Sequence, residues 1–163
     1  MENSLQNISI QKTKKFSDFL KYVYLITKEG LIPWIWYVFL VRIFSGKDSQ
    51  MVVIKENDQI IGGFCLTNFL LPKYKFYNWF KKDIQLKFDE LAKNNYQYFC
   101  CFVIKKSFRN KGIGAVAFET YIKQNHLKIW FTSSPGAVRF YLRQGARVYY
   151  PSKYDIYVFD ESN

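Results

Sequence analysis

Residues 96–124 of the chain read YQYFCCFVIKKSFRNKGIGAVAFETYIKQ, an apolar run followed by a glycine turn and an amphipathic segment. Tyr96 to Lys105 is rich in aromatic and β-branched residues, which predicts a central strand. The turn Ser107 to Lys111 follows, and the spacing of apolar residues over Gly112 to Gln124 predicts a helix. A strand, a glycine turn and a helix in this order can gather backbone amides at the start of the helix.

The turn Arg109-Asn110-Lys111-Gly112-Ile113-Gly114 has the composition of an anion site. Its two glycines lack a Cβ, so the backbone can bend sharply and approach a ligand closely. Successive amide N–H groups can point into one concavity, and the start of the helix adds partial positive charge. Arg109 and Lys111 add full charges, so the turn suits a pyrophosphate. The sequence lacks the Gly-Lys-Ser/Thr of an NTPase P-loop and the third glycine of a dinucleotide fold.

A second element follows the predicted helix. Lys128 to Thr132, KIWFT, predicts a buried strand, and residues 134–145 read SPGAVRFYLRQG. Together with the glycine turn, this resembles the signature of the GNAT superfamily of acyl-coenzyme A-dependent N-acyltransferases, Arg/Gln-x-x-Gly-x-Gly/Ala and then Asn-x-x-Ala-x-x-Phe-Tyr-x-x-x-Gly-Phe. The resemblance covers about Tyr96 to Tyr150. Ser134 stands where the family usually has Asn, and Ala146 replaces the aromatic residue after Gly145.

The resemblance implies a single-domain α/β (α+β) fold over residues 1–163. Its mixed, mostly antiparallel sheet would have about six or seven strands flanked by about four helices, with an inserted helical segment near residues 72–94. Periodicity predicts helices at Asp18 to Lys28 (capped by Ser17 and ended by Gly30), Trp34 to Phe44, part of Leu71 to Asn95, and Pro135 to Gln144. It predicts strands at Ile8 to Gln11, Gln50 to Lys55, Ile60 to Phe69, Arg147 to Tyr150 and Tyr154 to Phe159. A hairpin turn is predicted at Glu56-Asn57-Asp58.

The resemblance also implies roles for individual residues. The backbone of Asn110 to Ala115 would bind the pyrophosphate, and the end of the strand at Phe102 to Ile104 would leave its neighbour and pair with the pantetheine arm. The N–H of Ile104 would donate to the thioester oxygen, and Tyr141 would protonate the departing thiolate as a general acid. The residues expected at the coenzyme A site are Phe102, Val103, Ile104, Arg109, Asn110, Lys111, Gly112, Ile113, Gly114, Ala115, Ser134, Ala137 and Tyr141.

The acceptor side is less defined by the sequence. Amine attack needs a base or a water chain, and Tyr96 to Lys105 contains no carboxylate. Adjacent Cys100 and Cys101 are expected to point to opposite faces of their strand; a nucleophilic role is disfavoured, because an apolar strand raises a thiol's pKa. An aromatic pocket, a dimer face and plain core are all open readings for Trp34, Trp36, Tyr37, Tyr77, Trp79 and Phe80.

Composition bounds the class of protein. The chain has 163 residues, three cysteines and a net charge of +11, which favours anionic partners. Leu31 to Phe44 is apolar but too short to span a bilayer, no metal-ligand spacing is present, and free thiols indicate a reducing cytoplasm.

We expect an acetyl-CoA-dependent N-acetyltransferase, monomeric or homodimeric, acting on an amine of a small molecule, a protein or an RNA. A non-catalytic GNAT-fold module that binds coenzyme A or a partner, and a basic RNA-associated protein, are the alternatives.

Overall fold

A computed structural model describes residues 7–29, 41, 46–47, 49–68, 81–151 and 155–160. Within them lies one seven-stranded sheet with the order β1-β2-β3-β4-β5-β7-β6. The strands are β1 (Ile8–Thr13), β2 (Ser49–Glu56), β3 (Gln59–Thr67), β4 (Gln97–Ile104), β5 (Ile129–Thr132), β6 (Arg147–Tyr150) and β7 (Ile156–Phe159). Neighbouring strands are antiparallel except β4 and β5, which are parallel. The predicted mixed, mostly antiparallel sheet is confirmed, with β4 at its centre.

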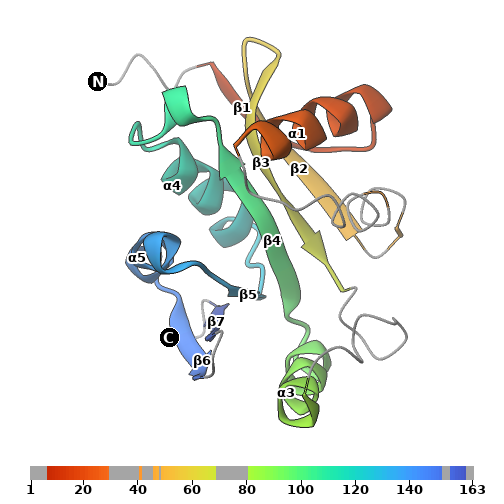
Figure 1. Cartoon of the computed structure of the whole chain (residues 1–163), viewed down its shortest axis with the longest axis vertical. Coiled ribbons are helices and arrows are strands. Elements are labelled where there is room, and N and C mark those ends of the chain that lie inside the picture. Colours follow the sequence, from red (N-terminus) through yellow and green to blue (C-terminus); the bar gives the residue numbers. More distant parts are fainter. Residues whose placement is uncertain are drawn as a thin grey trace.

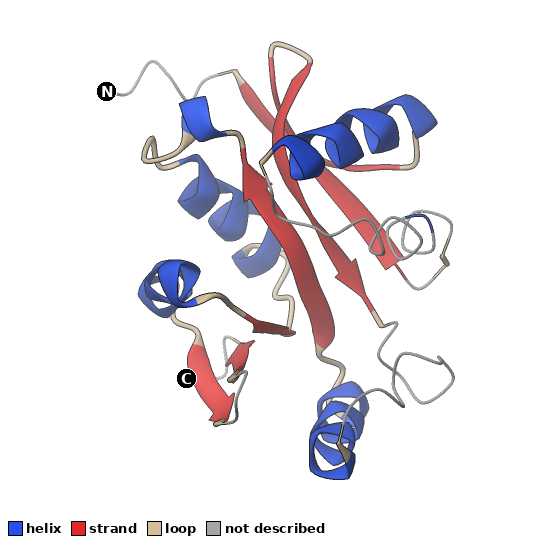
Figure 2. Cartoon of the chain, viewed as in Figure 1, coloured by secondary structure: helices blue, strands red, loops and turns tan. Residues whose placement is uncertain are grey.

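Helices cover both faces of this sheet (Figures 1 and 2). The helical segments are α1 (Phe16–Lys28), α3 (Lys82–Lys93), the 3-10 turn Lys106–Phe108, α4 (Ile113–Ala117), the π-helix Phe118–Lys123 and α5 (Pro135–Arg143). Side chains of α1 and α3 pack into one core cluster with the sheet. Side chains of α4, the π-helix and α5 pack into the clusters on the other side.

The β2–β3 hairpin forms where the sequence predicts it. Its two turn residues, Asn57 and Asp58, have φ angles of 47° and 64°. Two consecutive residues with positive φ match the right-handed twist of the strands that they join, and Asn and Asp tolerate this conformation better than most residues.

Helix α1 begins two residues before the predicted position, so the expectation of a Ser17 cap is wrong. Lys15 occupies the N-cap position, without a side-chain hydrogen bond. The Thr13 hydroxyl accepts a hydrogen bond from the Lys15 N–H at 3.1 Å and donates one to the Asp18 carboxylate at 2.9 Å. Thr13 therefore supports the first turn from outside the helix, and the chain turns before Ser17 is reached.

The helix after the glycine turn changes its winding halfway. Gly112 is the N-cap of α4, and the α-helical part ends at Ala117. From Phe118 the chain is π-helical, and the Gln124 N–H donates to the Glu119 carbonyl, five residues back, at 3.0 Å. Phe118 and Ile122 are both buried against the sheet.

Two predicted segments lie largely outside the described residues. Apart from Val41, the predicted helix Trp34 to Phe44 is among the undescribed positions, as are residues 69–80 and the six aromatic residues proposed for a pocket. The remainder of the insertion forms α3, where Phe88 and Leu91 are buried as the periodicity predicts. None of the helices in the described ranges has both the length and the apolar composition needed to cross a lipid bilayer.

Candidate active site

The central feature of the site is the divergence of β4 from β5. The two parallel strands pair only through Gln97 with Ile129 and Tyr98 with Trp130. Beyond Tyr98, β4 continues to Ile104 with β3 along its other edge. Beyond Tyr98, β5 therefore leaves the facing edge of β4 open to an extended ligand, over a longer stretch than Phe102 to Ile104, although the Ile104 carbonyl already accepts a hydrogen bond from Arg109.

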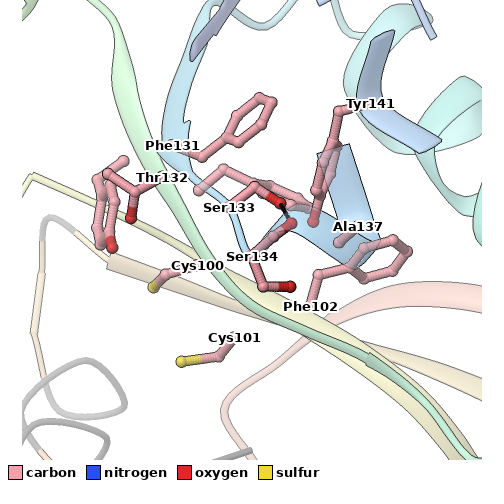
Figure 3. A pocket seen from close by; sticks show the side chains of 11 residues that line it. Cys100, Cys101, Phe102, Phe131, Thr132, Ser133, Ser134, Ala137 and Tyr141 are labelled. Carbon is pink, nitrogen blue, oxygen red and sulfur yellow. Dashed lines mark hydrogen bonds between the residues drawn. The ribbon is translucent and has the colours of Figure 1, made fainter. Parts of the chain in front are cut away.

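A cavity of about 260 Å³ lies at this divergence (Figure 3). β4 contributes Tyr98 to Phe102, and β5 and the start of α5 close the other side. Four of the predicted site residues line the cavity: Phe102, Ser134, Ala137 and Tyr141. Val103, Ile104 and the glycine turn lie outside this lining and follow it along the chain.

A β-bulge at Cys101 shapes the cavity wall. Cys101 has a φ of 58°, and the pairing of β3 with β4 shifts its register between Gly63 and Cys65. The hydroxyl of Tyr22 in α1 donates to the Cys101 carbonyl at 2.5 Å. A bulge places one extra residue in its strand, which disrupts the alternation of side chains.

The bulge overturns the expectation that Cys100 and Cys101 point to opposite faces. Both side chains pack against the core cluster on the α1 side of the sheet. Figure 3 shows both sulfur atoms on one side of the β4 ribbon and the Phe102 ring on the other. Burial raises the pKa of the Cys100 thiol well above its ordinary value, which agrees with the argument against a nucleophilic role.

Tyr141 projects from α5 into the cavity, with its hydroxyl directed toward Ser133, Ser134 and Phe102 (Figure 3). Its ring packs on Phe131 with the centroids 4.3 Å apart. Burial, and to a lesser degree Cys100, raise the pKa of the Tyr141 hydroxyl above its ordinary value. The group therefore stays protonated through the neutral and mildly alkaline range, as a proton donor must.

The glycine turn has an open backbone. Asn110 and Gly112 both have left-handed φ angles, 61° and 78°, and no atom lies within 4 Å of a Cβ built on Gly112. The Val116 N–H donates to the Gly112 carbonyl at 3.0 Å as the first bond of the helix. The amides of Ile113, Gly114 and Ala115 consequently have no partner within the helix.

Gly114 has different surroundings from Gly112. A Cβ at Gly114 would lie 3.4 Å from the Phe102 ring and 3.5 Å from the Phe140 ring, which are ordinary van der Waals distances. The start of the helix therefore packs beside these aromatic side chains, and the position has room for an alanine.

The two predicted cationic residues of the turn are placed differently. Arg109 donates from Nε to the Ile104 carbonyl at 2.8 Å and forms an ion pair with Glu29, which follows α1. The Glu29 carboxylate also accepts the N–H of Lys106 at 3.1 Å. Arg109 thus braces the turn against α1. The Lys111 ammonium lies 5.1 Å from the centre of the Phe108 ring.

Ser134 is the N-cap residue of α5, but its side chain makes no capping hydrogen bond. Its carbonyl accepts the N–H of Ala137 at 3.0 Å, and the Ser133 hydroxyl donates to the same oxygen at 3.2 Å. The Ser134 hydroxyl is left to line the cavity.

Several residues of the site were not predicted from the sequence. These are Tyr22 at the bulge and the cavity residues Tyr98, Phe99, Phe131, Thr132 and Ser133, while Cys100 and Cys101 were considered only as nucleophiles. The pattern SS before Pro135 could have indicated Ser133 beside the predicted Ser134. Neither the bulge nor the partner of its carbonyl has a local sequence signal, because both depend on contacts between distant segments.

The described part of the chain holds no group of three His, Cys, Asp or Glu side chains that could bind a metal ion. What it holds is a parallel strand pair that opens, an aromatic hydroxyl in the opening, and an amide-rich turn beyond it. This arrangement can accommodate an extended ligand along the edge of β4 that β5 leaves.

The sequence profile of the acetyltransferase (GNAT) family matches residues 13–146, and the chain belongs to this family. It is an acetyltransferase of the GNAT type. No curated protein matches the chain.

Solved structures share the fold at low sequence identity. The N-acyl amino acid synthase FeeM from uncultured soil microbes has a TM-score of 0.70 at 9% identity, covering 97% of this chain and 93% of FeeM. A GNAT acetyltransferase from Staphylococcus aureus Mu50 has a TM-score of 0.65 at 17% identity, covering 94% and 98%. An acetyltransferase from Streptococcus agalactiae 2603 has a TM-score of 0.64 at 15% identity, covering 95% and 99%.

Proposed function

We propose that the chain is an N-acetyltransferase that moves an acetyl or other short acyl group from acyl-coenzyme A to a primary amine by direct attack. The observation that carries the proposal is the cavity at the β4–β5 divergence, which has Tyr141 in its wall and the open glycine turn beyond its end. Family membership supports coenzyme A as the carrier, which supplies a thioester whose carbon is open to attack.

The glycine turn fits a pyrophosphate. The amides of Ile113, Gly114 and Ala115 are free of helix partners, and the residues on either side of Lys111 are left-handed, so successive N–H groups can converge on one anion. Lys111 supplies the full charge. Arg109 holds the turn in place through Glu29 and the Ile104 carbonyl.

The open edge of β4 would hold the pantetheine. Lys105 donates its N–H to the Ile61 carbonyl of β3 at 2.8 Å. Because successive N–H groups of a strand point to opposite edges, the N–H of Ile104 points to the edge that β5 leaves open. Phe102 to Ile104 can therefore bond an extended arm, and Ile104 stays a candidate oxyanion donor. The cavity lies nearer the bulge, which adds the amides of Cys101 and Phe102 as candidates.

Tyr141 would protonate the sulfur as the thioester breaks. Its pKa is raised by burial, so the proton is present over the working range, and a thiolate is basic enough to accept it. No carboxylate and no histidine belongs to the cavity lining formed by the described residues. We therefore infer that the attacking amine loses its proton to a water chain, or arrives neutral.

The net charge of the chain indicates only the general class of the acceptor. A net charge of +11 favours an anionic acceptor, including an amine carried by an RNA. The three cysteines are unpaired thiols, which fits a reducing cytoplasm as the location of the protein. We propose a monomer or homodimer in which residues 1–163 form one domain.

Two experiments test this proposal. Calorimetric titration with acetyl-coenzyme A should give a Kd in the micromolar range, about −8 kcal/mol in free energy. Thiol release over a panel of small amines, acidic peptides and aminoacyl-RNAs should then identify an acceptor. Binding without turnover of any amine would favour the alternative of a non-catalytic coenzyme A-binding module. Absence of binding would refute both.

A further inference from the structure

The cavity ends at Tyr98. The two strands that form its walls meet there, because Tyr98 pairs with Trp130 in the last rung before β4 and β5 separate. On the other side of Tyr98 lies a second, small void of about 10 Å³, lined by Thr67, Asn68, Phe88, Ala92, Tyr96 and Trp130 as well. Tyr98 is the one residue common to the two linings. Tyr98 therefore lies between the cavity and the small void, and we call it the partition.

The partition is held in place by its neighbours. The Tyr98 ring packs on the Trp130 ring with centroids 4.5 Å apart, and Trp130 packs on Phe88 at 4.7 Å. Packed aromatic rings in a core yield little to an intruding group, since inserting extra methylenes forces strain.

The direction of a bound acyl group follows from the order of the elements. The glycine turn comes after the end of β4, so a donor anchored there enters the cavity from the Ile104 end. From Ile104 the donor then follows β4 toward its amino-terminal end, where it passes the bulge at Cys101 and reaches Tyr98. The carbon atoms of the acyl group that lie farthest from the sulfur are consequently the ones that meet the Tyr98 ring.

We propose that Tyr98 limits the length of the acyl group, so that the site accepts short acyl chains of the acetyl and propionyl class. This inference rests on the proposed function. Cutting the ring back joins the small void to the cavity and lets longer acyl chains enter. Tyr98 is thus a specificity-determining residue, with no part in the chemistry itself.

The experiment uses stable thioether probes, so that no acceptor is needed. Coenzyme A, S-ethyl-coenzyme A and S-hexyl-coenzyme A are titrated into the wild type, Tyr98→Ala, Tyr98→Leu and Tyr98→Phe by calorimetry. We expect the wild type and Tyr98→Phe to bind the hexyl probe about tenfold or more weakly than the ethyl probe, since overpacking costs that much. In Tyr98→Ala and Tyr98→Leu the ratio should shrink to about threefold or less.

Phe88→Leu is the matched control, because Phe88 belongs to the same ring stack and lines the small void but not the cavity. It should keep the wild-type ratio. The inference is overturned if a folded Tyr98→Ala or Tyr98→Leu binds coenzyme A normally and keeps the full penalty for the hexyl probe, or if the wild type shows no penalty. Failure of the wild type to bind coenzyme A itself would instead overturn the proposed function, so the two failures are distinguishable.

Discussion

Gly112 and Gly145 are two glycines in the same conformational region with different surroundings. Their φ angles are 78° and 97°. A Cβ on Gly112 would meet no atom, whereas a Cβ on Gly145 would lie 3.6 Å from the Phe159 ring. An L side chain in this region costs about 1–2 kcal/mol at either position. Only Gly112 combines that conformation with an open space beside unpaired amides.

We expect Gly112→Ala and Gly145→Ala to lose similar stability, about 1–2 kcal/mol each in urea unfolding. Only the change at Gly112 should weaken binding of acetyl-coenzyme A, by about tenfold or more in calorimetry, and Gly112→Val should weaken it further. Equal affinities of the two alanine variants would show that the turn does not hold the donor.

Tyr141 is the residue whose ionisation decides the pH dependence. Because burial raises its pKa, the protonated form persists as pH rises. The wild-type rate should therefore show no alkaline loss from Tyr141 up to about pH 10, the ordinary pKa of a phenol. Tyr141→Phe should lower kcat by about a hundredfold or more, with little change in affinity for coenzyme A. Equal rates for the two proteins at every pH would remove the general acid role.

At the scale of elements, a buried ion pair links α1 to β2. Lys55 donates to the Asp18 carboxylate at 3.0 Å, and the two side chains are 9% and 7% exposed. Burial acts to raise the pKa of Asp18, but the hydrogen bonds from Lys55 and Thr13 outweigh it, and the pKa is lowered. The folded state therefore binds this proton less readily than the unfolded state.

This shift sets the pH window of the stability change. A lowered pKa stabilises the fold above the unfolded value of about 3.9, and the contribution is lost as pH falls through the folded value. Lys55→Met should destabilise the protein by about 3–5 kcal/mol at pH 7, because it leaves the buried Asp18 carboxylate without its cation. The double variant Asp18→Leu with Lys55→Met should recover most of this loss in urea unfolding. Equal stability of the single and double variants would contradict the argument.

The contact between α1 and the candidate site depends on a glycine of β3. A Cβ on Gly63 would lie 2.5 Å from the Val52 carbonyl and 2.7 Å from the Tyr22 ring. No other residue leaves room for Tyr22 to cross β3 and reach Cys101. The sequence predicted this region as a strand, which is correct, but the reason for its glycines is a contact between segments far apart in the chain.

The same contrast explains what could and could not be predicted. Asn57 and Asp58, and the glycine turn, are determined by local backbone preferences, and the hairpin and the strand–turn–helix order were predicted correctly. A positive φ at Cys101 is unfavourable locally and is maintained by tertiary contacts, so alternation predicted the wrong face for its side chain. The partition at Tyr98 depends on a ring stack from three elements, which periodicity does not encode.

At the scale of the whole molecule, the net charge of +11 acts on any anionic ligand. Coenzyme A carries its charge on phosphates, and screening shortens the range of attraction to about 10 Å at 0.1 M salt. The KM for acetyl-coenzyme A should therefore rise several-fold between about 0.05 and 0.5 M salt, through a slower association. S-acetylpantetheine, which has no phosphate, is the control and should show an almost constant KM. An identical salt response of both donors would exclude electrostatic attraction as the cause.

The bond from Tyr22 to the Cys101 carbonyl ties the chemistry of the site to a helix that need not touch the donor at all. A chimera that exchanged only the first thirty or so residues would alter the orientation of one peptide plane in the middle of the sheet. A graft of this site onto another chain should therefore transplant the amino-terminal helix together with the central strand.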